Sequence, residues 1–233
     1  MSEFPAYQTA PQYDRPVGWH AHPLRVMSIV TVVLVAITVL LNSASVLGGL
    51  YADDADTVSA LSTVAIIAYL GAGIAFVTWE RRARTNLDAF GVWGLKWGPG
   101  WTLGGWFIPL ANVVIPILVL GEIDKATATR AAAVRESEFG WGASDAGRPI
   151  FIFWAVSWPV NSFAGYAAVA LSSSSFAMVG VAITVLVEVA AGVAAILLVL
   201  RITNSQEMLR RTRPEAPPTA PPPPPAAWPE SAV

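Results

Sequence analysis

Long uninterrupted runs of apolar residues constrain this chain more than any other feature of its sequence. Four such blocks run over Val26 to Leu50, Val58 to Trp79, Ile150 to Leu171 and Phe176 to Leu200. At about 1.5 Å of rise per residue, a helix of about 20 residues reaches across a hydrocarbon core of roughly 30 Å. The chain is 55% hydrophobic and 13% charged, whereas soluble domains carry about 25% charged residues. These features predict an all-α, polytopic membrane helix bundle with four transmembrane helices.

A further apolar block, Trp101 to Leu120, contains residues that interrupt helices. They are Gly104, Gly105, Pro109, Asn112 and Pro116. Proline removes a backbone donor, so a regular helix would be interrupted twice. Backbone outside a helix at membrane depth must be shielded by protein. We therefore expect a re-entrant or interfacial segment that packs on the other helices, with Asn112 bonding the backbone groups that the prolines free; the alternative is a fifth, kinked span.

The placement of Lys and Arg favours the segment that does not cross. The connections 51–57 and 172–175 contain neither residue type. If 101–120 does not cross, all 14 Lys and Arg lie on one side, whereas a crossing divides them between the two sides. Basic residues near spans are biased to the cytoplasm. We therefore expect residues 80–148 and both termini on the cytoplasmic face of a cell membrane.

The segments outside the spans differ from them in composition. Residues 1–24 are polar and proline-containing without an apolar period, which indicates a disordered leader. Residues 121–138 predict a polar helix. The last segment, 211–233, includes the run Pro221 to Pro225, which favours extended polyproline II structure. The expected membrane domain is thus 25–210, between two disordered cytoplasmic tails.

A string of Trp, Arg, Gly and Pro residues between Trp79 and Asp124 carries a family resemblance. Its landmarks are Trp79, Arg82, Arg84, Asn86, Leu87, Trp97, Pro99, Gly100, Gly105, Trp106, Phe107, Pro109, Asn112 and Pro116. Later landmarks are Phe153, Trp154, Trp158, Arg201, Ile202, Thr203 and Gln206. Over roughly residues 25 to 210, this pattern resembles the bacterial membrane family catalogued as domain of unknown function 4328 (DUF4328). The resemblance implies a multi-helix membrane module without an assigned activity and supplies no catalytic residue.

Glu188 is an ionisable residue at the centre of the last apolar block. A charge at that depth costs about 2.5 to 3.5 kcal/mol on insertion scales and suggests function with a polar partner. Asn161 and Tyr69 occupy the middle of their own blocks. We therefore predict a midplane polar cluster in which Glu188 faces the bundle within reach of Asn161 or Tyr69. A small-residue face continues from it through Gly180, Thr184 and Gly192. The cluster is either neutral packing or a proton or solute site.

The basic and aromatic residues that follow the second block predict a cytoplasmic band. It contains Arg81, Arg82, Arg84, Lys96 and nearby Trp side chains. Two interpretations are open, because such a band either holds anionic headgroups, at about 1 kcal/mol per basic residue, or simply anchors the bundle. Membrane lipids are the expected partners, with protein contacts through the Pro-rich tail.

Several kinds of chemistry find no support in the sequence. The chain has no cysteine, and its two histidines, His20 and His22, are poorly spaced for a shared metal. The acidic loop with Asp53, Asp54 and Asp56 is expected to be solvated. No catalytic Ser/His/Asp set, phosphate-binding loop or nucleic-acid module is present. We therefore expect no cofactor, no metal and no enzymatic activity. The favoured function is a scaffold or sensor at the cytoplasmic face; the alternative is a small transporter or channel subunit that uses Glu188.

Overall fold

A computed structural model describes residues 20–51, 54–109, 111–139, 148–171 and 176–212. Within these ranges the chain forms six α-helices and no strand, as expected for the all-α class. The helices are α1 (Arg25–Tyr51), α2 (Ala55–Ala89), α3 (Trp101–Phe107), α4 (Ala111–Phe139), α5 (Arg148–Leu171) and α6 (Ala177–Thr212). Most of the predicted leader and of the predicted Pro-rich tail lies outside the described residues.

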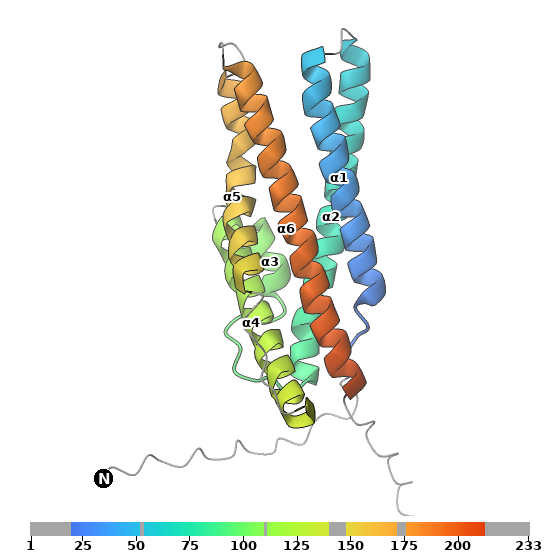
Figure 1. The fold of residues 1–233 in the computed structure, drawn as a ribbon, viewed down its shortest axis with the longest axis vertical. Helices are drawn as coiled ribbons and strands as arrows, with labels where there is room; N and C mark the ends of the chain where they lie inside the picture. The colour runs from blue at the N-terminus through green and yellow to red at the C-terminus, as the bar shows by residue number, and fades with distance from the viewer. Residues whose placement is uncertain (1–19, 52–53, 110, 140–147, 172–175, 213–233) are drawn as a thin grey trace, which may run out of the picture.

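Two helical hairpins stand side by side in the bundle (Figure 1). One consists of α1 and α2, the other of α5 and α6, and α1 packs on α6 to join them. The helices α3 and α4 lie along the lower half of the bundle in this view. The end at which α1 begins and α6 ends is called the basal end below, and the end at which both hairpins turn is called the distal end.

The outer faces of the long helices are apolar. Large hydrophobic side chains exposed on them include Val26, Ile29, Ile67, Phe163 and Leu186. Soluble proteins rarely expose a continuous apolar surface of this extent. Three described helices, α1, α2 and α6, are long and apolar enough to cross a membrane. The fold therefore has the features of a membrane protein.

The prediction of four transmembrane helices is supported for three of them, and α5 is the exception. This helix has 24 residues, which is sufficient in length, but it is not among the three described helices that are apolar enough to span. Its sequence includes Trp154, Ser157, Trp158, Pro159 and Asn161, which lower its mean hydropathy. Trp154 and Ser157 are buried against the rest of the protein. The helix is less apolar because part of its surface packs against the rest of the protein.

The helices α2 and α6 continue well past their apolar runs. α2 ends at Ala89 and α6 at Thr212, although the apolar blocks stop at Trp79 and Leu200. The charged stretch after Trp79, which was predicted as a cytoplasmic band, is therefore helical as far as Ala89. The core lies at this end of the molecule, and its fully buried members include Trp79, Leu87, Leu120, Ile123, Leu198 and Ile202.

The predicted break in the third apolar block is confirmed. α3 ends at Phe107 and α4 begins at Ala111, with Pro109 between them. The two helices fold tightly on one another, since a Cβ added to Gly105 would lie 2.6 Å from Ile115 Cγ2. A straight rod through this block is thereby excluded.

A second interruption, expected at Pro116, is absent. Pro116 lies inside α4, which continues through the residues predicted as a separate polar helix. Because it is close to the start of α4, the proline removes only one early backbone hydrogen bond from a long helix. The third apolar block and the polar helix therefore share one element.

A glycine turn ends α2. The amide of Phe90 donates to the Asn86 carbonyl at 2.9 Å, and the amide of Gly91 donates to the Asp88 carbonyl at 3.1 Å. Gly91 has a φ of 76°, in the left-handed region that glycine adopts without steric cost. The turn directs the following loop towards α3.

Candidate functional site

Buried polar side chains at the basal end join α2 to α6. The Trp79 indole donates through Nε1 to the Thr203 hydroxyl at 2.9 Å. Further along α2, Asn86 donates through Nδ2 to the Gln206 side-chain oxygen at 3.1 Å. All four residues are buried. Hydrogen bonds between buried amides and hydroxyls fix how two helices pack, because an unmet partner would be costly.

The same side chains extend the network to α4 and to the start of α1. Gln206 donates through Nε2 to the Ala83 carbonyl at 2.9 Å and to the Thr127 hydroxyl at 3.0 Å. Asn86 accepts from the His22 amide at 2.7 Å and donates to the His22 carbonyl at 2.9 Å. We call Trp79, Asn86, Thr127, Thr203 and Gln206 the basal network.

A loop between α2 and α3 is clasped from two sides. Arg84 donates through Nε to the Trp97 carbonyl at 2.7 Å and pairs with Asp88 at 2.8 Å. The Glu122 carboxylate of α4 accepts from the amides of Lys96 at 2.6 Å and Trp97 at 2.9 Å. Arg84 and Trp97, predicted as part of a lipid-facing band, therefore hold this loop in place.

Two further acidic residues hold helices together at the basal end. Arg201 of α6 pairs with Asp124 of α4 at 2.9 Å. Burial raises the pKa of Asp124, and the Arg201 guanidinium opposes part of this rise. The Glu207 carboxylate accepts from the Leu24 amide at 2.6 Å and so caps the start of α1.

Among the described residues, Glu80 has the most deeply buried carboxyl group. It has no exposed surface. Its Oε2 accepts from the Trp106 indole Nε1 at 3.0 Å, and its buried Oε1 has no hydrogen-bond partner among the described residues. Glu80 directly follows Trp79, a member of the basal network, and it also bonds Trp106 of α3. It therefore links the basal network to α3.

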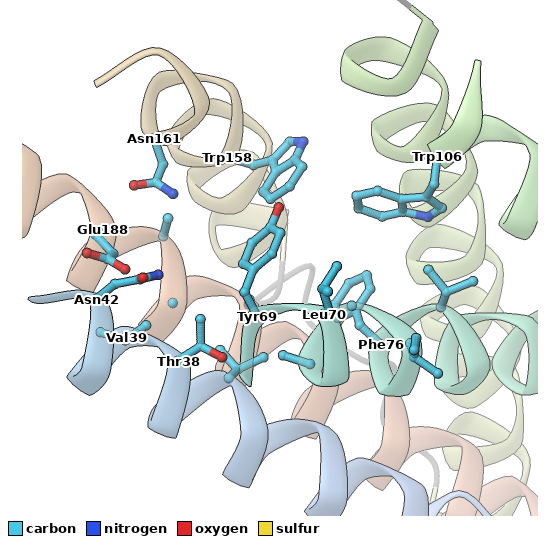
Figure 2. A pocket seen from close by; sticks show the side chains of 18 of the residues that line it. Thr38, Val39, Asn42, Tyr69, Leu70, Phe76, Trp106, Trp158, Asn161 and Glu188 are labelled. Atoms are coloured by element: carbon cyan, nitrogen blue, oxygen red, sulfur yellow. The ribbon is translucent and has the colours of Figure 1, made fainter. Parts of the chain in front are cut away.

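A cavity of about 400 Å³ is lined by residues of α1, α2, α3, α5 and α6 (Figure 2). We call it the hairpin cavity, because it lies between the hairpins, where the backbones of α2 and α5 stay apart and the rings of Phe76 and Trp154 stack at a distance of 6.4 Å. Its aromatic lining residues are Tyr69, Phe76, Trp106, Phe107, Trp154 and Trp158. Polar side chains in the lining include Thr38, Asn42, Asn161 and Glu188. The volume is within the range of about 300 to 1,000 Å³ that is typical of ligand sites.

The structure brings Glu188, Asn161 and Tyr69 to this one cavity. Among the described residues, however, the hydrogen-bonding neighbour of Glu188 is Asn42 of α1, and Figure 2 shows these two side chains together. Asn42 was not among the partners predicted from the sequence. The reason is the close approach of α1 to α6, since a Cβ added to Gly192 would lie 2.5 Å from Val39 Cγ2.

Residues 47–204 match a family described as "Domain of unknown function (DUF4328)". The match covers more than half of the chain and includes the cavity-lining stretches of four helices. The chain belongs to the DUF4328 family. Comparisons with curated proteins and with solved structures gave no match.

The landmarks of the DUF4328 resemblance occupy different environments. Trp79 and Asn86 belong to the basal network. Arg84 and Trp97 bond to each other at the loop between α2 and α3, and Trp106 lines the hairpin cavity. Pro116 is buried, whereas Arg82, Pro109 and Asn112 are exposed. No hydrogen bond of the Asn112 side chain is found within the described ranges, so its predicted role at the break in the helix is not seen.

Two residues of the candidate site were missed from the sequence. Asn42 lies inside the first apolar block, so the reasoning that selected Glu188 applies to it equally. Glu80 precedes Arg81 and Arg82, and a carboxyl beside two arginines is normally taken to be solvated. Its burial depends on α3 folding over α2, which no local pattern indicates.

The hairpin cavity combines apolar walls with a few polar groups. It offers aromatic rings, two side-chain amides and one carboxyl group. In the part of the chain that the structure describes, no group of three or more Asp, Glu or His is placed to hold a metal ion.

Proposed function

We propose that this DUF4328 protein is a non-enzymatic membrane sensor that binds an amphipathic small molecule between its helical hairpins. The hairpin cavity carries this proposal. Apolar walls with a few convergent polar groups are typical of small-molecule sites. Because the walls come from both hairpins, a bound molecule would contact α1 and α2 on one side and α5 and α6 on the other.

In the proposed topology the protein lies in the cell membrane with both termini in the cytoplasm. α1, α2 and α6 supply three crossings. α5 packs on α6 and rises with it to the distal end (Figure 1), which supports it as a fourth crossing. α3 and the start of α4 enter and leave on the basal side. All 14 Lys and Arg then lie on the cytoplasmic side, as the positive-inside bias favours.

Trp106 connects the cavity to the basal end. Its ring lines the cavity, and its indole N–H donates to the buried Glu80. A ligand that displaces this ring would disturb the hydrogen bond at 3.0 Å and the packing beside Trp79. The exposed Arg81 and Arg82 are available there to anionic headgroups, and the Pro-rich tail to proteins.

Transport is the second candidate function. It is favoured by the position of Glu188 in a cavity at membrane depth. Ligand flux across proteoliposomes that is lost in Glu188→Gln would support transport. Binding without flux would support the sensor.

Gly73 offers a way to fill the cavity. It lines the cavity, and a Cβ added to it would meet no atom within 4 Å. Gly73→Leu should therefore occupy ligand space without a backbone clash. Gly165→Leu is the matched control, because Gly165 also has no atom within 4 Å of an added Cβ and does not line the cavity.

The test measures binding of the uncharged probe N-phenyl-1-naphthylamine to protein in lipid nanodiscs, using energy transfer from tryptophan. Wild type and Gly165→Leu should show saturable binding, and Gly73→Leu should weaken it by about tenfold or more. Binding that is unsaturable in wild type, or that both variants weaken equally, would contradict a ligand site between the hairpins.

A further inference from the structure

The charge of the hairpin cavity comes from one residue. Its lining contains Glu188 but no Lys, Arg or His. Elsewhere in the described part of the chain, the arginines that pair with acids do so at the basal end, where Arg84, Arg201 and Arg210 pair with Asp88, Asp124 and Glu207. No protein cation in the described ranges therefore faces the Glu188 carboxyl.

A carboxyl at membrane depth needs a positive counter-charge or a proton. The Asn42 amide interacts with Glu188 but carries no charge. Isolated charges are costly in an apolar environment, and intramembrane ionisable groups pair with one another or mark substrate pathways. A cation that enters the cavity would supply the missing partner.

The aromatic rings of the cavity suit the same kind of ligand. The rings of Trp106 and Trp158 are 5.4 Å apart and meet edge to face at 73°. Phe76 lies 5.8 Å from Trp106 in a similar arrangement, at 79°. Rings packed edge to face in this way present both ring faces and ring edges to a ligand. Ring faces attract cations, and tryptophan does so best.

Resting on the proposed binding function, we propose that the ligand of the hairpin cavity is a lipophilic organic cation. This class comprises quaternary ammonium and phosphonium ions and protonated amines with apolar substituents. The carboxylate of Glu188 would pair with the charge, and the rings of Trp106, Trp158 and Phe76 would cover the apolar substituents. An anion of the same shape would meet a like charge and no basic side chain.

A pair of isosteric ions separates charge from shape. Tetraphenylphosphonium and tetraphenylborate have nearly the same form and opposite charges. Their binding is measured with purified full-length protein in nanodiscs, for wild type and Glu188→Gln. Glu136→Gln is the control, because Glu136 is an exposed carboxylate of α4 outside the cavity. Binding of N-phenyl-1-naphthylamine shows whether each variant still has an intact cavity.

Wild type and Glu136→Gln should bind tetraphenylphosphonium saturably and prefer it to tetraphenylborate by about tenfold or more. Glu188→Gln should lose this preference while it binds the neutral probe as wild type does. Equal affinity for the two ions, or an unchanged preference in Glu188→Gln, would overturn the cation assignment and leave the binding function standing. Failure of wild type to bind any of the three probes would overturn both.

Discussion

Gln206 shows how single residues determine the packing at the basal end. Its side chain accepts from Asn86 and donates to the Ala83 carbonyl and the Thr127 hydroxyl. It is buried, and a buried amide is tolerated when its hydrogen bonds are made. The sequence marked Gln206 and Asn86 as family landmarks, but it did not indicate their partners. Those depend on how α2, α4 and α6 pack together.

The pair of Arg201 and Asp124 yields a prediction at the same scale. Arg201→Leu leaves Asp124 buried without its cation, whereas Asp124→Asn removes the buried charge. Arg201→Leu should therefore lower the free energy of unfolding by up to about 3 kcal/mol, and Asp124→Asn by clearly less. Thermal or denaturant unfolding in detergent measures both changes.

The pH dependence distinguishes these two variants further. Burial raises the pKa of Asp124 above its usual value of 3.8, so the folded state binds this proton more readily than the unfolded state. Protonation of Asp124 therefore stabilises the folded state at low pH, and this contribution is lost as the pH rises through the pKa of the folded state. The deficit of Arg201→Leu should shrink as the pH falls towards 3.8. A deficit independent of pH, or a larger one in Asp124→Asn, would argue against this role.

At the scale of elements, apolar runs located the middle of the long helices but not all of their ends. α1 agrees closely with its predicted span, whereas α2 and α6 extend to Ala89 and Thr212 as polar helices. These extensions carry members of the basal network, and hydropathy does not reveal such polar contacts within the protein. The break at Pro109 was predictable because proline and glycine act locally. By contrast, α4 continues past Pro116 because a long helix follows, and the local sequence around the proline does not indicate this.

Gly192 provides the prediction for the contact between α1 and α6. A side chain there would collide with Val39, because an added Cβ would lie 2.5 Å from Val39 Cγ2. Gly192→Leu should destabilise the bundle by about 1 to 3 kcal/mol through overpacking. Adding Val39→Ala should recover part of the loss.

The thermal unfolding midpoint in detergent measures this effect, with Gly165→Leu as the control that has open space. If Gly192→Leu unfolds like the control, or if Val39→Ala gives no recovery, α1 does not approach α6 as closely as described.

At the scale of the whole molecule, sequence reasoning found residues of the cavity but not the cavity itself. Counting along each block predicted a shared depth for Tyr69, Asn161 and Glu188, and all three line the cavity. Their arrangement around an open volume arises because the backbones of α2 and α5 stay apart while α1 and α6 approach closely. Such relations between helices distant in sequence leave no periodic pattern in the chain.

Membrane topology is tested cleanly because the chain has no native cysteine. Asp56 near the distal end and Thr129 of α4 are both exposed. An impermeant thiol reagent applied to intact cells should label Asp56→Cys, and it should label Thr129→Cys only after the cells are opened. Labelling of Thr129→Cys from outside would exclude the arrangement with a non-crossing third block.

Photolabelling tests binding between the hairpins most directly. Wild-type protein in nanodiscs is irradiated with an uncharged aryl diazirine, and the modified residues are located by mass spectrometry, with and without excess N-phenyl-1-naphthylamine. Binding in the cavity predicts adducts on both hairpins, at lining residues such as Asn42, Phe76 and Trp158, that disappear with the competitor. Adducts at outward-facing Ile67 and Leu186 should persist. Labelling confined to outward-facing residues, and insensitive to the competitor, would contradict a ligand site between the hairpins.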